Sequence, residues 1–399
     1  MELHISSRLI GSDLGLTVDT ESGVTRLDAG SPTTWTVGDP SAIMSVEMLA
    51  SVSGIQADLQ PPEAFAQAQR EVGISPSRTP WRWVLPPLVF RQYIRDILDV
   101  SRDVLDRGVV EYYSSVFGVA RSCLDRLERA VIDGPELDTR LRHEGAEGQR
   151  RVLRSFSPGD DGLTHPVTYS QVSSRTGRLV VRKGPQILTL RRDLRNILRS
   201  RYSGGLIVQV DFVSLEARIA ALLAGVVPER DVYAQVAREV LDGRHTRAAA
   251  KLACLSVLYG AGPQRLAGQL GTDRQSAAEI IQEVSSFFGA GARARSLVRE
   301  AVDSGCVANF YGRILPADDK SSHVLYNNFI QSTGVDVAML GFDWIMDRFG
   351  RGVHPLFVLH DALILDVHPD RMADIVDMTK SVVPVDRFVG GFYIDVSEF

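Results

Sequence analysis

The sequence predicts a mixed α/β fold of the α+β kind, in which strands and helices occupy separate stretches of the chain. Two apolar runs of strand length indicate a sheet: one extends from Leu206 to Val210, and the other from Leu356 to Val367, with two apolar arms around His360-Asp361. Apolar residues at three- and four-residue spacing from Pro87 to Val131, and across residues 225–300, indicate helices.

The N-terminal part is predicted to change character at about residue 86. Residues 1–85 are expected to form short strands and turns, because Gly, Ser, Thr and Asp interrupt short apolar pieces. The helical pattern that starts at Pro87 is expected to end at Asp133-Gly-Pro135. Strands and turns around Thr176-Gly177-Arg178 follow, and a helix is expected from about Arg191 to Arg199.

The C-terminal half is predicted to place acidic residues at the ends of buried strands. Asp211 follows the strand Leu206 to Val210, and Ser214 is a suitable N-cap for a helix through Glu216 to Leu223. The second apolar run predicts a hairpin with Asp361 at its tip. Two further elements are expected, a turn between short strands at Phe310–Pro316 and a helix from about Val324 to Phe349.

Composition and length describe an ordinary soluble globular protein. With 399 residues, of which 44% are hydrophobic and 23% charged, the chain can hold two or three domains. Its longest apolar runs are of strand length, which argues against a transmembrane helix, and the N-terminus lacks the pattern of a signal peptide. Three cysteines, far apart and odd in number, fit reduced thiols better than disulfides or a zinc site. A cytoplasmic protein with no membrane partner is therefore expected.

The net charge is −5, but basic residues gather between Gln171 and Gly205, where only Asp193 opposes them. A basic stripe on an acidic protein is typical of a surface that binds a phosphate backbone. A solvated helix face has the same charge pattern, so both interpretations stay open. The stripe consists of Arg175, Arg178, Arg182, Lys183, Arg191, Arg192, Arg195, Arg199 and Arg201.

Two carboxylates are candidates for binding divalent metal ions. Asp211 and Asp361 each adjoin an apolar strand, so neighbouring strands would bring both acids to one place. Magnesium prefers oxygen ligands and shares them with substrate phosphates, so two carboxylates suffice, with the backbone carbonyl of Phe212 able to complete a site. An acid at the end of a strand is also a common helix cap or turn residue, and either Asp alone is compatible with that role.

A predicted helix carries cations that suit a triphosphate. Arg247, Lys251, Leu255 and Tyr259 follow one another at four-residue intervals, which places them along one slowly drifting helix face. Arg and Lys on adjacent turns can hold the β and γ phosphates, and Lys251 can donate a proton to pyrophosphate. Tyr259 offers a ring for stacking, and Gly260 allows the backbone to approach a base. An amphipathic helix with two solvated cations would show the same spacing.

Together these segments resemble the motifs of the family A DNA polymerases, the bacterial DNA polymerase I type. The likeness extends over about residues 163 to 399, in the family's order and at nearly its spacing. Motif A of the family, Asp-Tyr-Ser-x-x-Glu-x-Arg, is matched at Asp211, Glu216 and Arg218, with Phe212 in the Tyr position.

The other motifs are matched to different degrees. Motif B, Arg-x3-Lys-x7-Tyr-Gly, is matched in full by Arg247, Lys251, Tyr259 and Gly260. Motif C, His-Asp-Glu, is represented by His360-Asp361-Ala362, which lacks the Glu. Two more segments are similar to the family, namely Thr176-Gly177-Arg178-Leu179 and Asn327-x3-Gln331-x-Thr333-x2-Asp336.

The resemblance implies a right-hand polymerase fold. It would have an antiparallel-sheet palm, built from residues 163–222 with motif A and 323–399 with motif C, and helical fingers with motif B at 223–322. A reduced helical thumb would occupy 86–162, and the role of 1–85 is unknown. Val18-Asp19-Thr20-Glu21 resembles the first motif of a 3′–5′ exonuclease, but the stretch between this motif and Thr176 is too short for a complete exonuclease domain and a thumb. It is therefore interpreted as a coincidence or a remnant.

The resemblance also implies roles for individual residues. Asp211 and Asp361, with the carbonyl of Phe212, bind two Mg²⁺ ions, for which Mn²⁺ can substitute. Arg247 and Lys251 bind the triphosphate. Glu216 blocks a 2′-hydroxyl. Leu255 takes the place of an aromatic that lies against the sugar. Contacts with the primer terminus and the minor groove are assigned to Arg178, Gln331 and His360. The remaining residues assigned to substrate binding are Tyr259, Gly260 and Asn327.

The expected function is that of a template-directed DNA polymerase, a monomer that adds dNTPs to the primer of a primer–template DNA without proofreading. A bacterial cell or a phage-infected host would be its setting. Glu216 favours deoxynucleotides, because the similar single-subunit RNA polymerases lack this residue. Two alternatives remain: a primase, RNA-synthesising or terminal-transferase variant of the same fold, and a catalytically degenerate DNA-binding replication factor, which Ala362 favours.

Overall fold

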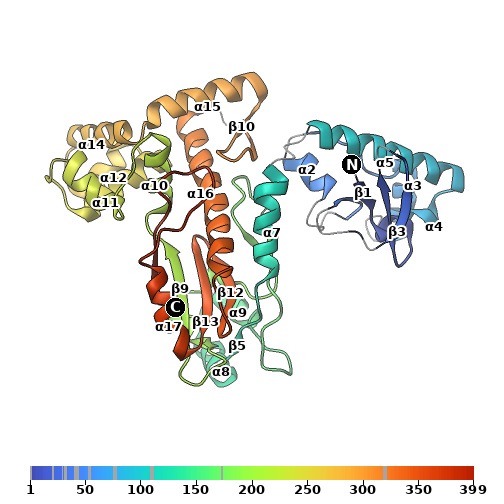
Figure 1. The fold of residues 1–399 in the computed structure, drawn as a ribbon, viewed down its shortest axis with the longest axis horizontal. Coiled ribbons are helices and arrows are strands. Elements are labelled where there is room, and N and C mark those ends of the chain that lie inside the picture. The colour runs from blue at the N-terminus through green and yellow to red at the C-terminus, as the bar shows by residue number, and fades with distance from the viewer. Residues whose placement is uncertain are drawn as a thin grey trace. The chain divides into compact units, whose positions relative to one another are not determined.

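The computed structural model shows a mixed α/β fold, in agreement with the predicted class (Figure 1). It describes residues 2–19, 22–28, 30, 34–39, 45–52, 55–74, 79–107, 112–171, 174–317 and 321–399. The chain divides into two units, one made of residues 1–121 with 311–314 and the other of 122–310 with 315–399. In the described part of the chain no helix is long and apolar enough to cross a membrane.

The first unit contains a four-stranded sheet in the order β3-β2-β1-β4. β1 (Glu2–Ile5) is antiparallel to β2 (Gly15–Asp19) and parallel to β4 (Trp35–Val37), and β2 is antiparallel to β3 (Thr25–Asp28). The exonuclease-like motif begins at the end of β2, but Thr20 and Glu21 lie outside the described residues.

The expectation of only strands and turns over residues 1–85 was incomplete, because several helices lie there. They are α1 (Ser7–Ile10), α2 (Val46–Val52), α3 (Glu63–Glu71) and α4 (Trp81–Val84). Short helices of this kind draw their stability from tertiary packing, which the local pattern does not reveal. The longer α5 (Pro87–Arg107) follows the predicted periodicity. Its buried residues recur at steps of three or four, at Tyr93, Ile97, Ser101 and then the adjacent pair Val104 and Leu105.

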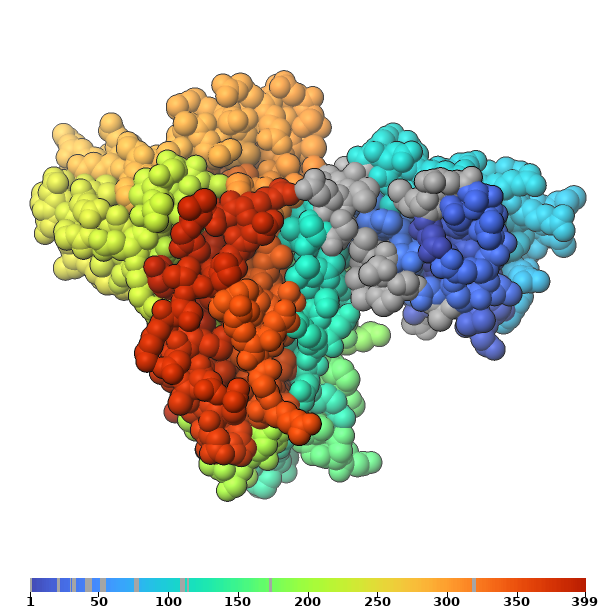
Figure 2. Space-filling view, in the orientation of Figure 1, coloured from blue at the N-terminus to red at the C-terminus, as the bar shows by residue number. Residues whose placement is uncertain are grey.

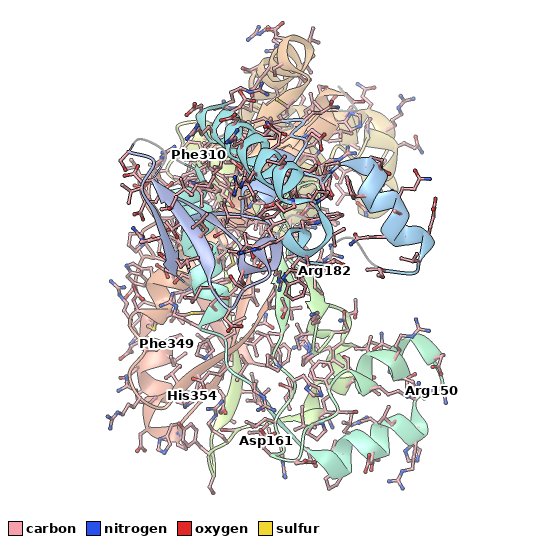
Figure 3. All side chains as sticks on the ribbon, turned by 90° about the vertical axis from the view of Figure 1, so that its right-hand side faces the viewer. Arg150, Asp161, Arg182, Phe310, Phe349 and His354 are labelled. Carbon is pink, nitrogen blue, oxygen red and sulfur yellow. The ribbon has the colours of Figure 1, made fainter. Side chains whose placement is uncertain are left out.

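Between the first helices and the main sheet the chain forms short elements. They are η2 (Tyr113–Phe117), α7 (Gly118–Asp125), β5 (Val131–Ile132), α8 (Gly134–His143), α9 (Glu147–Arg154), β6 (Thr168–Ser170), β7 (Val180–Lys183) and η3 (Ile187–Thr189). Asp133 starts α8, because its side chain accepts a hydrogen bond from the Glu136 N–H. In Figure 3 α8 and α9 form a helical pair with Arg150 on the second helix and Asp161 on the loop that follows.

The helix expected from about Arg191 to Arg199 is present in part, as a shorter 3₁₀ helix. A 3₁₀ helix, η4 (Arg192–Ile197), leads directly into β8 (Leu198–Arg199), which pairs with β5. Leu194 and Ile197 are buried at helix-like spacing, but the strand pairing at Leu198 ends the turn. The tertiary partner therefore decides the backbone here.

The second unit is organised around a four-stranded antiparallel sheet in the order β12-β13-β9-β14. Its strands are β9 (Leu206–Phe212), β12 (Val353–Leu359), β13 (Ala362–Val367) and β14 (Ile394–Glu398). The predicted strand and hairpin are thus confirmed, with one adjustment: β9 continues two residues beyond Val210, so Asp211 lies inside the strand. Val208, Val210 and Phe212 point to the buried face, and Asp211 belongs to the other face.

The long helix α16 (Ser322–Met346) packs against the buried face of this sheet, close to the predicted bounds. The Phe212 ring lies 5.5 Å from that of Phe342 on α16 and 6.2 Å from that of Phe392. A Cβ added at Gly341 would lie 2.4 Å from the Phe212 ring, so a glycine is needed at this crossing. Phe212 therefore anchors β9 in the core and fixes the position of Asp211 beside it.

Helices of the second unit extend from the end of β9. They are α10 (Leu215–Leu223), α11 (Val232–Gln235), η5 (Val236–Val240), α12 (Arg247–Tyr259), α13 (Pro263–Leu270), α14 (Arg274–Phe287) and α15 (Ala290–Ser304). Thr246 caps α12 by accepting a hydrogen bond from the Ala249 N–H. Ser214 occupies the predicted N-cap of α10 but makes no side-chain cap bond there, because its backbone is left-handed with φ 54°.

The remaining elements are β10 (Cys306–Ala308), β11 (Ile314–Pro316), η6 (Pro369–Arg371) and α17 (Met372–Met378). The two short strands flank the turn that was predicted within Phe310–Pro316. Arg230, just before α11, joins the C-terminal segments by donating to the carbonyls of Thr379 at 2.7 Å and Ile394 at 3.0 Å. Figure 2 shows these segments side by side on one face, yellow-green against red.

Candidate active site

The sheet brings the two predicted carboxylates together. Asp211 on β9 lies directly opposite Ala362 on β13, the residue that follows Asp361. The Phe212 N–H donates to the Asp361 carbonyl at 3.3 Å, and His360 adopts a left-handed φ of 58° that lets the hairpin reverse within two residues. The expectation that Asp211 and Asp361 lie on neighbouring strands is therefore met.

A third carboxylate, which the sequence analysis missed, flanks Asp211 on its other side. Asp395 on β14 is opposite Asp211, so Ala362, Asp211 and Asp395 form one row across three strands on the same face. The Arg230 guanidinium holds Asp395 at 2.5 Å. No motif marks Asp395, and only its register with Asp211 reveals it.

Both carboxyl groups are half-buried and resist ionisation. Burial raises the pKa of Asp211 to about 7, and the neighbouring charge of Asp361 acts in the same direction. Burial also raises the pKa of Asp361, against the opposing influence of His360, Arg178 and Lys251. Two acids of this kind side by side favour a bound cation, which would compensate the charge that burial disfavours.

A divalent ion fits this pair of acids. The Asp211 Oδ1 atom is buried and has no hydrogen-bond partner among the described residues, which leaves one hard oxygen donor unused. The part of the chain that the structure describes contains no cluster of three or more His, Cys, Asp or Glu residues that could enclose a metal. The donor set therefore suits Mg²⁺, which takes few protein ligands and completes its shell with water and phosphate oxygens.

A cavity of about 590 Å³ adjoins the carboxylates and collects most of the predicted site residues. Gly260 and Asn327 are the predicted residues that do not line it. Gly260 ends α12 with φ 70° and faces His323, and Asn327 donates to the Leu258 carbonyl at 3.2 Å and accepts from Gln331 at 2.7 Å. The predicted residues that do line it are Arg178, Asp211, Phe212, Glu216, Arg247, Lys251, Leu255, Tyr259, Gln331, His360 and Asp361.

The two cations of α12 share an aromatic neighbour that the sequence analysis missed. Arg247 and Lys251 lie 5.7 Å and 5.8 Å from the centre of the Tyr233 ring, and Tyr233 lines the cavity. The Arg247 Nε donates to the Asp231 carboxylate at 2.5 Å, and the other oxygen of Asp231 caps α11 at the Ala234 N–H. The sequence signal that could have identified Asp231 is its N-cap position before the short helix α11.

Glu216 is held by two partners from different parts of the chain. The Tyr259 hydroxyl donates to its carboxylate, and Arg178 lies 3.3 Å from it. Burial raises the pKa of Glu216, although both partners favour its charged form. The side chain is therefore fixed in the first turn of α10 at the edge of the cavity, between the carboxylates and the C-terminal end of α12.

Sequence comparison identifies relatives of the C-terminal part. The model of DNA polymerase family A matches residues 151–387. The thermostable DNA polymerase I of Thermus filiformis is 27% identical over 256 residues, which cover 55% of this chain and 31% of the relative. The DNA polymerase I of Deinococcus radiodurans is 26% identical over 250 residues, which cover 54% of this chain and 26% of the relative. The DNA polymerase of Mycobacterium phage D29 is 27% identical over 147 residues, which cover 34% of this chain and 24% of the relative.

Structure comparison gives a similar fold over nearly the whole chain. The POL domain of Pol1 from M. smegmatis, solved in complex with DNA primer-template and dNTP, matches with a TM-score of 0.62 and 15% identity, covering 96% of this chain and 91% of that one. The chain spans about a third or less of the length of the curated relatives it matches. Because the family model covers more than half of the residues, the chain belongs to DNA polymerase family A.

Proposed function

We propose that the chain is a template-directed DNA polymerase that adds dNTPs to a primer 3′-hydroxyl. The observation that carries this proposal is one cavity lined by a carboxylate pair, Asp211 and Asp361, and by two cations, Arg247 and Lys251. Nucleotidyl transfer requires this combination, because the reacting phosphate must meet both metal ions and a cationic support for the triphosphate. The similar solved structure was determined with primer-template DNA and dNTP, which supports the same ligands here.

The fold divides into the parts of a right-hand polymerase under this proposal. The antiparallel sheet with α16 is the palm, built from residues 163–222 and 323–399. The helices within 223–322 are the fingers. The reduced thumb is assigned to 86–162, although its helices are divided between the two units, α5 in the first and α8 and α9 in the second. Residues 1–85 have no proposed role.

The metal ions would be held by Asp211, Asp361 and the carbonyl of Phe212. When bound, two Mg²⁺ ions, or Mn²⁺ in their place, supply activation of the 3′-hydroxyl and stabilisation of the leaving pyrophosphate. Asp211 must lose its proton before it can act as a ligand, and its unpartnered Oδ1 is free to do so. The buried Phe212 ring keeps the backbone of this site rigid.

Arg247 and Lys251 are assigned to the triphosphate. Arg247 offers a planar fork of donors to phosphate oxygens, and Lys251 offers a compact charge and a proton for pyrophosphate. The Tyr233 ring beside both cations restricts where they point. The ion pair between Asp231 and Arg247 must open, at least in part, when a triphosphate binds.

Glu216 is assigned to sugar selection. Tyr259 and Arg178 hold this carboxylate in place, and at that position it would block a 2′-hydroxyl at the edge of the sugar. Leu255, in place of an aromatic, lines the same cavity and would contact the sugar through an aliphatic side chain. Arg178, Gln331 and His360 are assigned to the primer terminus and the minor groove, where acceptors are nearly independent of sequence.

We also propose that the chain lacks proofreading, because the stretch between Asp19 and Thr176 is too short for a complete exonuclease domain in addition to a thumb. Two alternatives stay as outcomes of experiment. A variant that uses ribonucleotides or no template would keep the fold and change the product. A degenerate replication factor would bind DNA without extending it.

Primer extension in Mg²⁺ with the Asp361→Ala protein tests the assignment of the carboxylates. The variant is expected to lose extension and to retain primer-template binding, measured by fluorescence anisotropy. Asp377→Ala serves as a matched control, because Asp377 is an exposed carboxylate that pairs with Lys380 on the surface. Extension at the wild-type rate by Asp361→Ala would refute the assignment. Wild-type protein that binds DNA but never extends it would favour the degenerate factor.

A further inference from the structure

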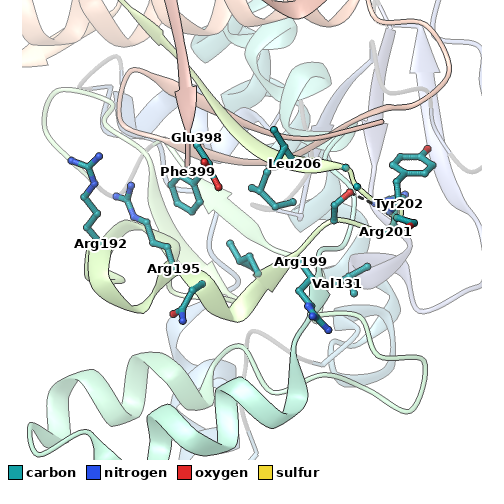
Figure 4. A pocket seen from close by; sticks show the side chains of 16 residues that line it. Val131, Arg192, Arg195, Arg199, Arg201, Tyr202, Leu206, Glu398 and Phe399 are labelled. Atoms are coloured by element: carbon teal, nitrogen blue, oxygen red, sulfur yellow. Dashed lines mark hydrogen bonds between the residues drawn. The ribbon is translucent and has the colours of Figure 1, made fainter. Parts of the chain in front are cut away.

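The cavities of the second unit differ in the chemistry of their walls. The cavity in Figure 4, of about 760 Å³, has four arginines in its lining, Arg192, Arg195, Arg199 and Arg201. A smaller cavity, of about 380 Å³, has mainly apolar walls. It lies between the end of α10, the first half of α15 and the first half of α16, and in Figure 1 α15 crosses the upper end of α16. Among the described residues, it shares no lining residue with the cavity that contains the carboxylate pair.

The apolar part of this smaller cavity suits a flat ring. Ala220, Phe288 and Ile330 line it, and each of them is at most 2% exposed, so packing against the core fixes these walls. A volume of 380 Å³ falls at the lower end of the range for small-molecule sites, which is roughly 300–1,000 Å³. The size and the walls therefore fit a small aromatic compound.

A buried hydroxyl at this cavity lacks a hydrogen-bond partner. Tyr326 on α16 lines the cavity and is 3% exposed, and its hydroxyl forms no hydrogen bond with any residue that the structure describes. Burial raises the pKa of Tyr326, and the nearby charge of Arg293 opposes that rise, so the group is a neutral O–H donor. A buried donor without an acceptor is unfavourable, and a ligand with an acceptor atom would remove that cost.

The start of α15 gives the same cavity a positive end. Arg293 lines it and forms no ion pair with a described acidic residue, and its guanidinium carbon lies 5.4 Å from the centre of the Phe329 ring. Gly289, the N-cap of this 15-residue helix, provides no side-chain cap, so the first N–H groups lack a side-chain acceptor. Because no acidic side chain of the described chain lines the cavity, an anion would meet no opposing charge there.

We propose that this cavity binds a small aromatic carboxylate. Its ring lies against Phe288 and Ile330, and its carboxylate accepts hydrogen bonds from Arg293 and from the Tyr326 hydroxyl. A neutral hydrocarbon would fill the apolar part equally well, but it would leave both polar groups without a partner. The inference concerns a site separate from the nucleotide cavity, and it does not depend on the proposed polymerase function.

Calorimetric titration of the full chain, without DNA or nucleotide, tests the charge requirement. The probes are 2-naphthoate and 2-naphthamide, which have the same ring system and differ in charge. Wild type is expected to bind 2-naphthoate about tenfold more tightly than 2-naphthamide, because only the carboxylate pairs with a cation. Equal affinity for the two probes, or no binding of 2-naphthoate, would overturn the proposal.

Variants at the two polar groups test the assigned contacts. Arg293→Ala is expected to weaken 2-naphthoate binding about tenfold and to remove the preference over 2-naphthamide. Tyr326→Phe is expected to weaken it about fivefold, as the loss of one hydrogen bond predicts. The matched control is Arg295→Ala, because Arg295 is an exposed arginine on the same helix that does not line the cavity. Equal losses in Arg293→Ala and Arg295→Ala would show general attraction to a basic helix and would contradict the site.

Two further measurements locate the probe and check the unpartnered hydroxyl. Arg247→Ala alters the nucleotide cavity and is expected to bind 2-naphthoate as wild type does, whereas a tenfold loss would place the probe in that cavity and refute the assignment. The melting temperature of the ligand-free protein is expected not to fall in Tyr326→Phe, because the hydroxyl has no partner to lose. A clear fall would mean that the hydroxyl already serves the fold, and the argument for a ligand acceptor would fail.

Discussion

Replacement of Asp211 by Asn is predicted to stabilise the metal-free protein while abolishing catalysis. Burial raises the pKa of this carboxyl from 3.8 to about 7. A group whose pKa is higher in the folded state adds stability below its unfolded pKa, and that stability is lost as the pH rises through the folded pKa. Ionised Asp211 therefore costs stability at pH 8, and an uncharged amide of the same shape does not.

The size of the effect follows from the two pKa values. Each pKa unit corresponds to about 1.4 kcal/mol, so the full difference is roughly 4 kcal/mol at pH 8. Asp211 is not completely buried, and solvent screening reduces this value to the order of 2 kcal/mol. At pH 5 the folded carboxyl is still protonated. The stability that the protein gains from Asp211→Asn is therefore less than roughly half of the gain at pH 8.

Equilibrium urea unfolding in the presence of a chelator, followed by circular dichroism at pH 5 and pH 8, measures the predicted gain. Asp377→Asn, at an exposed carboxylate, is the control and is expected to change little at either pH. Added Mg²⁺ should diminish the advantage of Asp211→Asn, because only the wild type gains binding energy from the ion. A variant that is equally or less stable than wild type at both pH values would refute the burial argument.

Three further predictions follow from the cavity. Asp231→Asn keeps the cap of α11 but removes the charge that holds Arg247. Pyrophosphate should then inhibit extension at a roughly threefold lower concentration, because Asp231 no longer competes with phosphate for Arg247. An unchanged inhibition constant would contradict this competition. Glu216→Ala should lower the preference for dNTPs over NTPs, measured as a ratio of kcat/KM, by at least about tenfold, and Tyr259→Phe should lower it less because the carboxylate stays; an unaltered ratio in Glu216→Ala would exclude Glu216 from sugar selection. Mn²⁺ binding should weaken as the pH falls from 8 to 6, because the raised pKa of Asp211 keeps that ligand protonated, and a calorimetric titration independent of pH would contradict it.

The elements that carry the site could be predicted from the sequence because their signals are local. Leu206 to Val210 and the arms around His360-Asp361 are apolar runs of a length that is typical of buried strands, and the structure pairs them as β9, β12 and β13. The four-residue spacing from Arg247 to Tyr259 gives one helix, α12, with both cations facing the same cavity.

Other parts of the site depend on pairing between distant segments. Asp395 lies on an exposed edge strand, and only its register with Asp211 makes it part of the carboxylate row. Tyr233 lies on the four-residue helix α11 and Asp231 caps it, and the importance of both comes from contact with α12. A helix was predicted from about Arg191 to Arg199, but the pairing of β8 with β5 leaves only the 3₁₀ helix Arg192–Ile197 before the strand, with Arg192 and Arg195 beside one cavity.

Incorporation of a single nucleotide tests the central claim most directly. A labelled primer is annealed to four templates that differ in the first unpaired base, and each dNTP and NTP is supplied alone with Mg²⁺. A DNA polymerase with Glu216 as its sugar gate is predicted to add the complementary dNTP on each template and to reject the matching NTP. Addition that ignores the template base, a preference for NTPs, or no addition by protein that binds the DNA would contradict the account.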